Sequence, residues 1–407
     1  MIAFDAEKEQ QVQPVVSIKV IGIGGAGGNT VNSIMDSGSS GIECLVVNTD
    51  AQSLEASRAP VKIQIGVKST KGLGAGANPE LGKRAAQEDL DKIMEELTSA
   101  DIVFLTGGMG GGTGSGALPV VARALREQGI LSIAVVTRPF SFEGKRRSKI
   151  ADEAIASLKK EVDTLIIIPN QRLLDVVGKD VSMIDAFAMI NDVLSQSVCG
   201  ISDIITRSGH INVDFADVKA IMKDMGLAVM GTGTASGEDR ATKATLHAIS
   251  SPLLENMSIT GARGVLLNIT GGRNLGLHEI SEAASIIYEQ AHEDANIILG
   301  SVIDESMEDR VAVTIIATGF SHQQENISSV TVQQKIKEEV PLKATILDKA
   351  HADTTLMAKT AELPTDMPKQ EPIAYITQTT TTATLATLED LDVPTFMRTR
   401  KEHETTE

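Results

Sequence analysis

Two acidic residues three positions apart, Asp214 and Asp217, form the most suggestive catalytic pair in the sequence. They belong to the segment Asn212-Val-Asp-Phe-Ala-Asp217, where a loop is expected to enter a helix, and this spacing can direct both carboxylates the same way. Such a pair can polarise and position a water molecule for attack on a phosphoryl group. The simpler alternative is a helix N-cap followed by a first-turn acid, and the residues alone favour that alternative.

A glycine-rich run from Gly107 to Gly116 points to a second kind of chemistry, the binding of phosphate. It follows an apolar segment at 102–106 and precedes a helical stretch, so its backbone amides can surround an anion. The hydroxyls of Thr113 and Ser115 could add donors. The pattern G-x-x-x-x-G-K-[ST] does not occur in the sequence, so backbone amides rather than a lysine are expected to hold the phosphates. Mg²⁺ is the expected accompanying ion, and no side-chain metal ligands are predicted.

A second glycine loop, Gly22–Asn29, follows the first apolar segment and opens a helix. It matches the dinucleotide pattern G-x-G-x-x-G, and Asp50 follows the next strand, where a ribose-binding carboxylate would lie. Taken alone, this region predicts an NAD-binding oxidoreductase, and that alternative stays open. Two glycine loops at strand ends of one sheet instead favour a triphosphate held from two sides.

The elements that must position these residues are short apolar segments alternating with helical stretches. The segments are apolar throughout, as expected for strands buried on both faces of a parallel sheet; they lie at 15–21, 44–48, 61–65, 102–106, 131–137 and 165–168. A long helix is predicted at 182–206, and a second α/β region follows. Its strands are expected at 227–232, 264–269, 296–303 and 311–317, with helices at 239–249 and 277–291. The predicted fold class is α/β, with a Rossmann-like, mostly parallel sheet and a mixed sheet in the second region.

Composition excludes several classes of protein. The net charge of −17 argues against a nucleic-acid partner, because such a chain would repel a phosphate backbone. Two widely separated cysteines indicate neither a disulfide framework nor a zinc site. The sequence shows no apolar stretch long enough for a membrane span and no signal-peptide pattern, so a cytosolic protein is expected.

The segment Gly110-Gly-Gly-Thr-Gly-Ser-Gly116 resembles the signature loop of the tubulin superfamily. Neighbouring segments resemble the FtsZ family of bacterial cell-division GTPases, over roughly residues 15–320 and the C-terminal peptide. The segments that carry this resemblance lie at 72–80, 138–147, 168–173 and 212–217.

This resemblance implies that the ligand is GTP or its product GDP, and it assigns roles to individual residues. Those implied to contact or cover the phosphates are Gly25, Ala26, Gly27, Gly28, Asn29, Gly74, Ala75, Gly76, Gly111, Gly112, Thr113 and Gly114. Glu143 and Arg147 match the ribose contacts, although an i,i+4 ion pair on a helix is the simpler interpretation. Asn170, Phe187 and Asn191 match the base contacts, with a core phenylalanine and a solvated asparagine as the simpler interpretation.

The resemblance also implies self-assembly. In the family, the loop that corresponds to Asn212, Asp214 and Asp217 contacts the GTP of the next subunit, so the GTPase active site forms only on head-to-tail polymerisation into a division-ring filament. The upstream residues Arg207-Ser-Gly-His210 depart from the family pattern, which puts subunit affinity in doubt. A paralogue that polymerises without hydrolysing GTP is a further alternative.

The C-terminal segment resembles the family's partner-binding peptide. Its implied contact residues are Asp392, Val393, Pro394, Phe396, Met397 and Arg398. Division adaptor proteins would bind there, so membrane attachment is expected to be indirect. The predicted organisation is a flexible N-terminus at 1–14, a GTP-binding domain at 15–181, the central helix at 182–206, a second domain at 207–320, a disordered linker at 321–388 and the peptide at 389–407.

Overall fold

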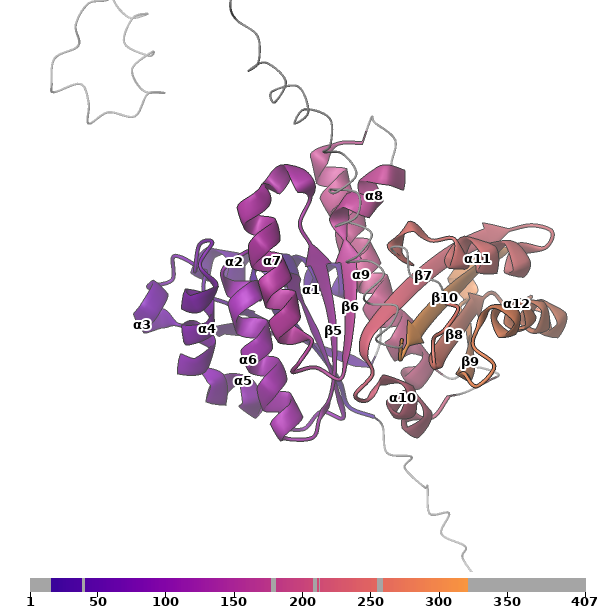
Figure 1. The fold of residues 1–407 in the computed structure, drawn as a ribbon, viewed down its shortest axis with the longest axis horizontal. Helices are drawn as coiled ribbons and strands as arrows, with labels where there is room; N and C mark the ends of the chain where they lie inside the picture. The colour runs from indigo at the N-terminus through magenta and orange to yellow at the C-terminus, as the bar shows by residue number, and fades with distance from the viewer. Residues whose placement is uncertain are drawn as a thin grey trace, which may run out of the picture. The chain divides into compact units, whose positions relative to one another are not determined.

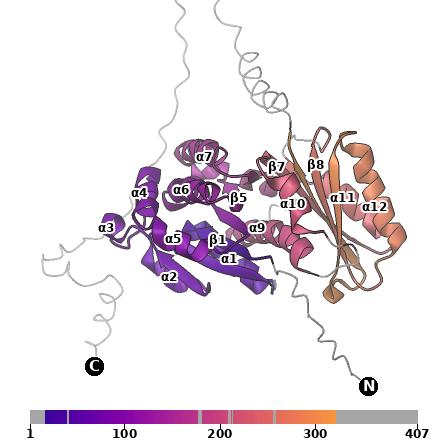
Figure 2. The same ribbon diagram turned by 90° about the horizontal axis from the view of Figure 1, so that it is seen from below.

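The computed structural model describes residues 16–38, 41–176, 181–207, 211, 213–254 and 259–320. Within these residues, ten strands form one sheet in the order β3-β2-β1-β4-β5-β6-β7-β10-β8-β9, with helices packed on both faces (Figures 1 and 2). The predicted α/β class with a mostly parallel sheet is therefore confirmed. The predicted segments at 1–14, 321–388 and 389–407 lie outside the described residues.

The first six strands all run parallel. They are β1 (Ile18–Ile23), β2 (Ile42–Asn48), β3 (Val61–Gln64), β4 (Ile102–Gly108), β5 (Leu131–Arg138) and β6 (Thr164–Pro169). Each of the six apolar segments is a strand, with ends that differ by a few residues from those predicted. Because parallel strands end at the same edge of a sheet, the loops that follow them gather along one line.

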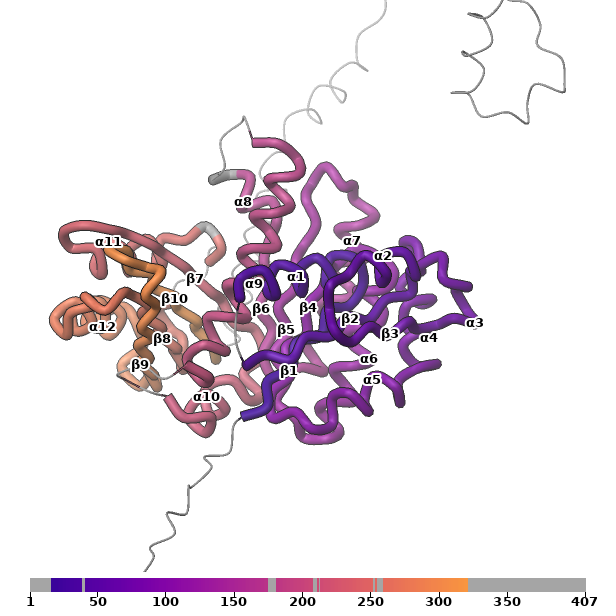
Figure 3. The backbone as a smooth tube through the Cα atoms, turned by 180° about the vertical axis from the view of Figure 1, so that it is seen from behind, coloured from indigo at the N-terminus to yellow at the C-terminus, as the bar shows by residue number. Residues whose placement is uncertain are grey.

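Two layers of helices cover this parallel part of the sheet. On one face lie α1 (Gly24–Asp36) and α9 (Met183–Thr206), which share a buried aliphatic cluster with β1, β4 and β5 (Figure 3). On the other lie α4 (Pro79–Glu88), α5 (Leu90–Leu97), α6 (Thr113–Glu127) and α7 (Lys145–Leu158), packed in a second cluster (Figure 1). Short helical turns complete this region: α2 (Ala51–Ala56), α3 (Val67–Thr70), η1 (Ser141–Glu143) and α8 (Asn170–Val176).

The second region continues the same sheet in mixed directions, as predicted. Its elements are α10 (Phe215–Met222), β7 (Gly226–Ser236), α11 (Arg240–Ile249), η2 (Pro252–Leu254), β8 (Gly264–Gly271), α12 (Leu277–Gln290), β9 (Asn296–Ile303), η3 (Glu305–Met307) and β10 (Arg310–Thr318). Strand β7 pairs in parallel with β6, while β10 runs antiparallel to both β7 and β8. Helices α11 and α12 pack over a third aliphatic cluster.

Helix α9 runs along the sheet from the carboxyl ends of the parallel strands to their amino ends. Its 24 residues span about 36 Å at 1.5 Å per residue. Its first turn is capped by Ser182, whose hydroxyl accepts a hydrogen bond from the amide of Asp185 at 3.1 Å. Its last turn lies beside the start of β2, because a side-chain atom of Thr206 would be 3.3 Å from a Cβ added to Gly41. The described part of the chain contains no helix that is long and apolar enough to cross a membrane.

Candidate functional site

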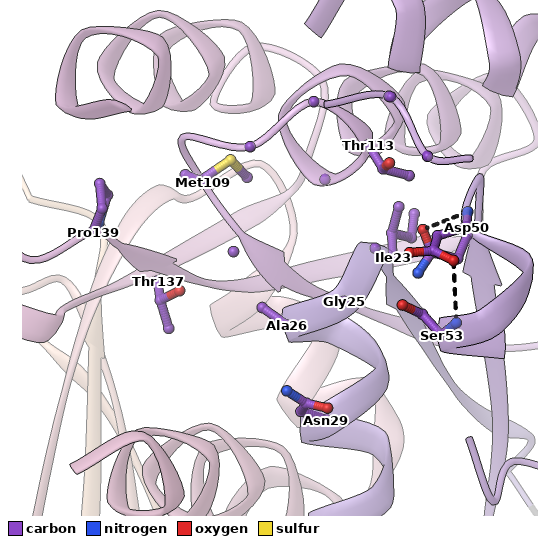
Figure 4. Close-up of a pocket in the computed structure, with 18 of the residues that line it drawn as sticks. Ile23, Gly25, Ala26, Asn29, Asp50, Ser53, Met109, Thr113, Thr137 and Pro139 are labelled. Carbon is purple, nitrogen blue, oxygen red and sulfur yellow. Dashed lines mark hydrogen bonds between the residues drawn. The ribbon is translucent and has the colours of Figure 1, made fainter. Parts of the chain in front are cut away.

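A cleft of about 570 Å³ opens at the carboxyl edge of the parallel strands. Its walls come from the residues that follow β1, β2, β4, β5 and β6, from the loop before α4 and from the first half of α9. Figure 4 labels lining residues that follow β1, β2, β4 and β5. The sheet topology accounts for its place, since ligands in open α/β sheets bind beyond the carboxyl ends of the strands.

Two helix N-termini face this cleft. Helix α1 begins at Gly24 and α6 begins at Thr113, and residues of both first turns line the cleft. Neither first turn contains an acidic residue. The unpaired amide groups and the positive dipole ends of both helices therefore favour an anion between them.

The order of the strands determines which residues lie at each end of the cleft. The sequence β3-β2-β1-β4-β5-β6 places the residues after β2 at one end and those of β6 and α9 at the other. Figure 4 shows Asp50 and Thr113 toward one side of the cleft, with Thr137 and Pro139 toward the other. The two helix N-termini lie between, so an elongated ligand would place its anionic part near β1, β4 and β2.

The α9 end of the cleft is built for a flat polar group. Phe187 is 40% exposed and its ring meets Phe140 edge-to-face at 5.5 Å, so it is not the core residue of the simpler interpretation. Asn191 lies one turn further along α9 and also lines the cleft. Asn170 is buried, and its side-chain oxygen has no hydrogen-bond partner within the described part of the chain. An amide oxygen held in this way can accept hydrogen bonds from a ligand.

Glu143 and Arg147 satisfy both of the interpretations raised by their spacing. They form an ion pair with each other, as an i,i+4 pair would, and both line the cleft. Glu143, the last residue of η1, also accepts a hydrogen bond from the amide of Phe140 at 2.9 Å, which fixes its position just before α7. The pair is thus oriented before any ligand is present.

The opposite end of the cleft is closed by the loop Gly74–Gly76. This loop lies directly against the turn that starts α6, because a Cβ added to Gly112 would be 2.3 Å from the carbonyl oxygen of Gly76. Thr113 joins the loop after β2 through a 2.7 Å hydrogen bond between its hydroxyl and that of Thr49. Asp50 caps α2 by accepting from the amides of Gln52 and Ser53, and it lines the cleft as well.

The structure brings together all but two of the residues predicted to bind nucleotide. The exceptions are Gly27 and Gly28, which do not line the cleft. A Cβ on Gly27 would be 2.6 Å from the carbonyl oxygen of Thr106, so this glycine lets α1 pack closely on the sheet. Ser115, whose hydroxyl could add a donor, does not line the cleft; that hydroxyl is buried and accepts from the amide of Gly110 at 2.9 Å.

Sequence reasoning missed several residues that line the cleft. They are Ile23, Asn48, Ser53, Leu73, Thr137, Pro139, Ile190 and Leu194, whereas the further lining residues Gly24, Gly108 and Met109 belong to the two predicted glycine loops. Most directly flank a strand end or a predicted contact, so the rule that loops after parallel strands converge could have found them.

The acidic pair lies apart from the cleft. Asp214 and Asp217 begin α10, and neither lines the cleft. Asp214 caps the helix by accepting from the amide of Asp217 at 3.0 Å, and both carboxylates are exposed, so the simple capping role is present in the structure. Asn212 and residues 208–210 lie outside the described residues.

Helix α10 is anchored at the amino edge of the sheet. The hydroxyl of Thr164, the first residue of β6, donates to the carbonyl oxygen of Met222 at the end of α10. Upstream, Arg207 pairs with Asp203 at 3.0 Å and with Asp304 at 3.4 Å. Burial raises the pKa of Asp203 despite this partner.

No group of three or more His, Cys, Asp or Glu side chains among the described residues could hold a metal ion. A phosphate-bound Mg²⁺ does not need such a group, because phosphates and water supply most of its ligands. Oxygen donors suited to it, the Thr113 hydroxyl and the Asp50 carboxylate, lie at the Gly74–Gly76 end of the cleft.

Comparison with known families agrees with this arrangement. The GTPase domain of the Tubulin/FtsZ family matches residues 17–178, and the C-terminal domain of the FtsZ family matches residues 226–321. Because the first match is a GTPase domain, a GTPase activity and GTP binding are supported and the nicotinamide oxidoreductase is set aside.

Solved structures extend the comparison. An empty FtsZ dimer from M. jannaschii is 43% identical, with a TM-score of 0.73, and the match covers 76% of this chain and 89% of that one. Two Haloferax volcanii proteins share the fold. GDP-bound CetZ1 is 22% identical with a TM-score of 0.67, and the match covers 79% of this chain and 100% of that one. CetZ2 is 20% identical with a TM-score of 0.65, and the match covers 80% of this chain and 100% of that one. These organisms are archaea, so the comparisons support the family but not the bacterial source that the motifs suggest. The two domain matches and the 43% identity together show that the chain belongs to the FtsZ family of tubulin-like GTPases.

Proposed function

We propose that this protein hydrolyses GTP to GDP and phosphate while polymerising head-to-tail into the filaments of a cell-division ring, with each active site shared between adjacent subunits. One observation carries the proposal: helix α10, which begins at the exposed acidic pair Asp214/Asp217, lies by the amino ends of the parallel strands, whereas the nucleotide cleft lies at their carboxyl ends (Figure 1). A pair so placed is far from the chain's own cleft and free to meet another molecule.

The geometry suits stacking in a single direction. The cleft lies where the parallel strands end, whereas α10 is tied to the start of β6, and α9 runs from one edge to the other (Figure 1). When identical subunits stack along that direction, the acidic edge of one meets the cleft of the next. This contact is heterologous and does not close, so repetition gives a filament.

The rim of the cleft has the surface expected of a contact face. Large apolar side chains are solvent-exposed there or close by in the chain, namely Leu73, Phe142, Met183 and Ile184. Such side chains would leave water if a neighbouring subunit covered the rim. The M. jannaschii FtsZ is described as a dimer and the CetZ2 as a GTPγS-bound protofilament, which supports self-association here.

In the proposed reaction, the carboxylates of Asp214 and Asp217 from the neighbouring subunit orient a water molecule and accept its proton. The water oxygen bonds to the γ-phosphorus as the bond to the bridging oxygen breaks, and GDP leaves with the electron pair of that bond. The N-termini of α1 and α6 stabilise the negative charge that develops on the phosphates. Mg²⁺, when bound, would supply further positive charge next to the Thr113 hydroxyl and the Asp50 carboxylate.

The base-binding end fits guanine. Asn170 and Asn191 offer amide groups for the edge of the base, and the Phe187 ring can stack on its face. We assign the filament to the cytoplasm at the division site, in a bacterial or an archaeal cell. Its C-terminal peptide, Asp392 to Arg398, would bind division adaptors, which would link it indirectly to the membrane.

The test separates capping from catalysis. Asp214→Asn keeps an oxygen that can accept from the Asp217 amide but removes the carboxylate, so α10 should stay capped. GTP binding by this variant should match the wild type in calorimetry, while phosphate release should fall at least a hundredfold. Unchanged turnover would support the capping role alone.

A mixing experiment tests the shared site directly. Gly25→Trp adds a large side chain where no atom lies within 4 Å of the new Cβ, so it should fill the cleft without disturbing the backbone. Asp214→Asn keeps the cleft but lacks the acid. Neither variant should release phosphate alone, but their mixture should recover turnover, because a Gly25→Trp subunit can supply its acidic pair to its neighbour. A mixture that co-sediments without releasing phosphate would contradict the proposal.

A filament protein that binds GTP without hydrolysing it is the second candidate, favoured by the capping role already visible at Asp214. Phosphate release should be measured against protein concentration, with light scattering recorded in parallel. A cooperative rise in both signals supports the shared GTPase. Scattering with no phosphate release at any concentration supports the second candidate.

A further inference from the structure

Thr49 lies between two segments of the cleft wall that are far apart in the sequence, the start of α6 and the loop Gly74–Gly76. It follows β2 and is fully buried, and it does not itself line the cleft. Its hydroxyl is 2.7 Å from the hydroxyl of Thr113, the first residue of α6. Its carbonyl oxygen accepts from the amide of Gly74, in the loop that closes the cleft, at 3.4 Å.

A short antiparallel bridge strengthens the link to the closing loop. Asp50 pairs with Leu73, and the amide of Ala51 donates to the carbonyl oxygen of Gly72 at 3.1 Å. These hydrogen bonds tie residues 49–51 to residues 72–74. The Gly74 bond is long for an N–H···O contact, so this end of the bridge can shorten if a ligand draws the loop inward.

The direction of the hydroxyl pair depends on what fills the cleft. Either hydroxyl can donate while the cleft holds no ligand. A phosphate oxygen needs a donor, so its arrival turns the Thr113 proton toward the ligand, and Thr49 must then donate to Thr113. A chain of donors arranged in this way is mutually strengthening.

We infer that Thr49 is a positioning residue that couples the Thr113 hydroxyl to the Gly72–Gly76 loop, and that this coupling lets the protein distinguish a nucleoside triphosphate from a diphosphate. Thr113 and Gly74 both belong to the end of the cleft opposite Phe187 and Asn191, where the terminal phosphate of a nucleotide would lie; a third partner, the Thr70 hydroxyl, donates to the Thr49 carbonyl oxygen at 3.4 Å from outside the cleft. A diphosphate lacks the terminal phosphate that would occupy that end, so its binding would depend less on the contact between Thr49 and Thr113. Because the role presupposes a nucleotide in the cleft, it rests on the proposed function.

The test compares GTPγS and GDP binding to the full chain by calorimetry. Thr49→Val keeps the shape of the side chain but removes the hydroxyl, so the preference for GTPγS over GDP should fall about tenfold while GDP affinity changes less than about twofold. Thr49→Ser retains the hydroxyl and should restore the preference. Thr106→Val is the matched control, because its hydroxyl is buried without a partner among the described residues; this variant should keep the wild-type preference.

A second pair of measurements distinguishes positioning from general structure. If Thr49 acts through Thr113, the Thr49→Val/Thr113→Val double variant should discriminate no worse than Thr113→Val alone. Hydrogen exchange at residues 72–76 should slow on GTPγS binding in the wild type and in Thr49→Ser, but less in Thr49→Val. Hydrogen exchange is measured on the folded protein. If Thr49→Val does not fold, the same comparison with Thr49→Ala tests whether the Thr49 hydroxyl is needed for the slowing at residues 72–76.

Three results would overturn the inference, and they distinguish the coupling from the proposed function. An unchanged GTPγS preference in Thr49→Val, or additive effects in the double variant, would refute the coupling while leaving the proposed function intact. Wild-type protein that binds neither nucleotide would refute the proposed function and the coupling with it.

Discussion

The contact between Gly112 and the Gly74–Gly76 loop gives the sharpest prediction about the cleft. In Gly112→Ala, the new Cβ would be 2.3 Å from the carbonyl oxygen of Gly76 and 2.9 Å from the Cβ of Ala75. An ordinary close C···O contact is about 3.3 Å, so the loop must retreat by about 1 Å. Backbone on both sides leaves no flexible side chain to yield. Overpacking of this kind costs about 1–3 kcal/mol.

That cost should appear in one of two measurements. If the loop moves, GTPγS affinity should fall by roughly 5- to 150-fold in calorimetry, since about 1.4 kcal/mol corresponds to a factor of ten. If the loop holds, the free energy of unfolding of the nucleotide-free protein should fall by the same amount in urea titration. Gly111→Ala is the control for unfolding, because its new Cβ has no atom within 4 Å. Wild-type affinity together with wild-type stability in Gly112→Ala would refute this account of the loop.

Three further predictions concern stability and reactivity. Arg240→Met should lower the free energy of unfolding by about 1–3 kcal/mol in urea titration, because the buried guanidinium pairs with the partly buried Glu279 at 2.8 Å and with the exposed Asp309 at 3.0 Å, and its loss leaves the Glu279 carboxylate with only the Gly276 amide; equal stability in the two proteins would contradict this. The hydrogen bond from Arg240 holds the pKa of Glu279 below its ordinary 4.5. The ionised Glu279 therefore stabilises the folded protein above pH 4.5, and this contribution is lost as the pH falls below that value. The loss of folding stability in acid should accordingly be smaller in Arg240→Met. Burial raises the pKa of the Cys44 thiol to about 11, so a maleimide at pH 8 should label Cys44 only after denaturation, as mass spectrometry can establish. Asp214→Ala should cost about 1 kcal/mol of unfolding free energy through the lost helix cap, whereas Asp214→Asn should cost little, and equal losses would argue against the cap.

The strands could be predicted from the sequence because their signal is local. The segment at 296–303 has the same bounds in the structure, and each of the other predicted strands is present with ends shifted by a few residues. Uninterrupted apolar runs are what a sheet buried on both faces requires, and the flanking glycines mark where each run stops. The glycine loops follow from the same pattern, so most of the cleft was predictable.

What the sequence could not supply were contacts between distant segments. Thr113 and Ser115 look equivalent in the glycine run, yet Ser115 accepts from Gly110 and Thr113 lines the cleft, because side chains two positions apart on a helix point about 200° apart. Thr49 carries no motif, and its role depends on two segments that lie more than 20 positions away in the chain. At Asp214 the sequence could not separate two roles, because helix capping and catalysis both favour an acidic residue at that position.

The path of α9 from one edge of the sheet to the other has a consequence for any filament built from this chain. If the acidic pair acts across the contact, a filament of n subunits holds n−1 complete sites, because one terminal cleft has no neighbour to supply carboxylates. That terminal subunit would keep its triphosphate after the interior had been hydrolysed. The two ends of the filament would therefore differ chemically as well as in shape, and growth and loss of subunits would follow different rates at each end.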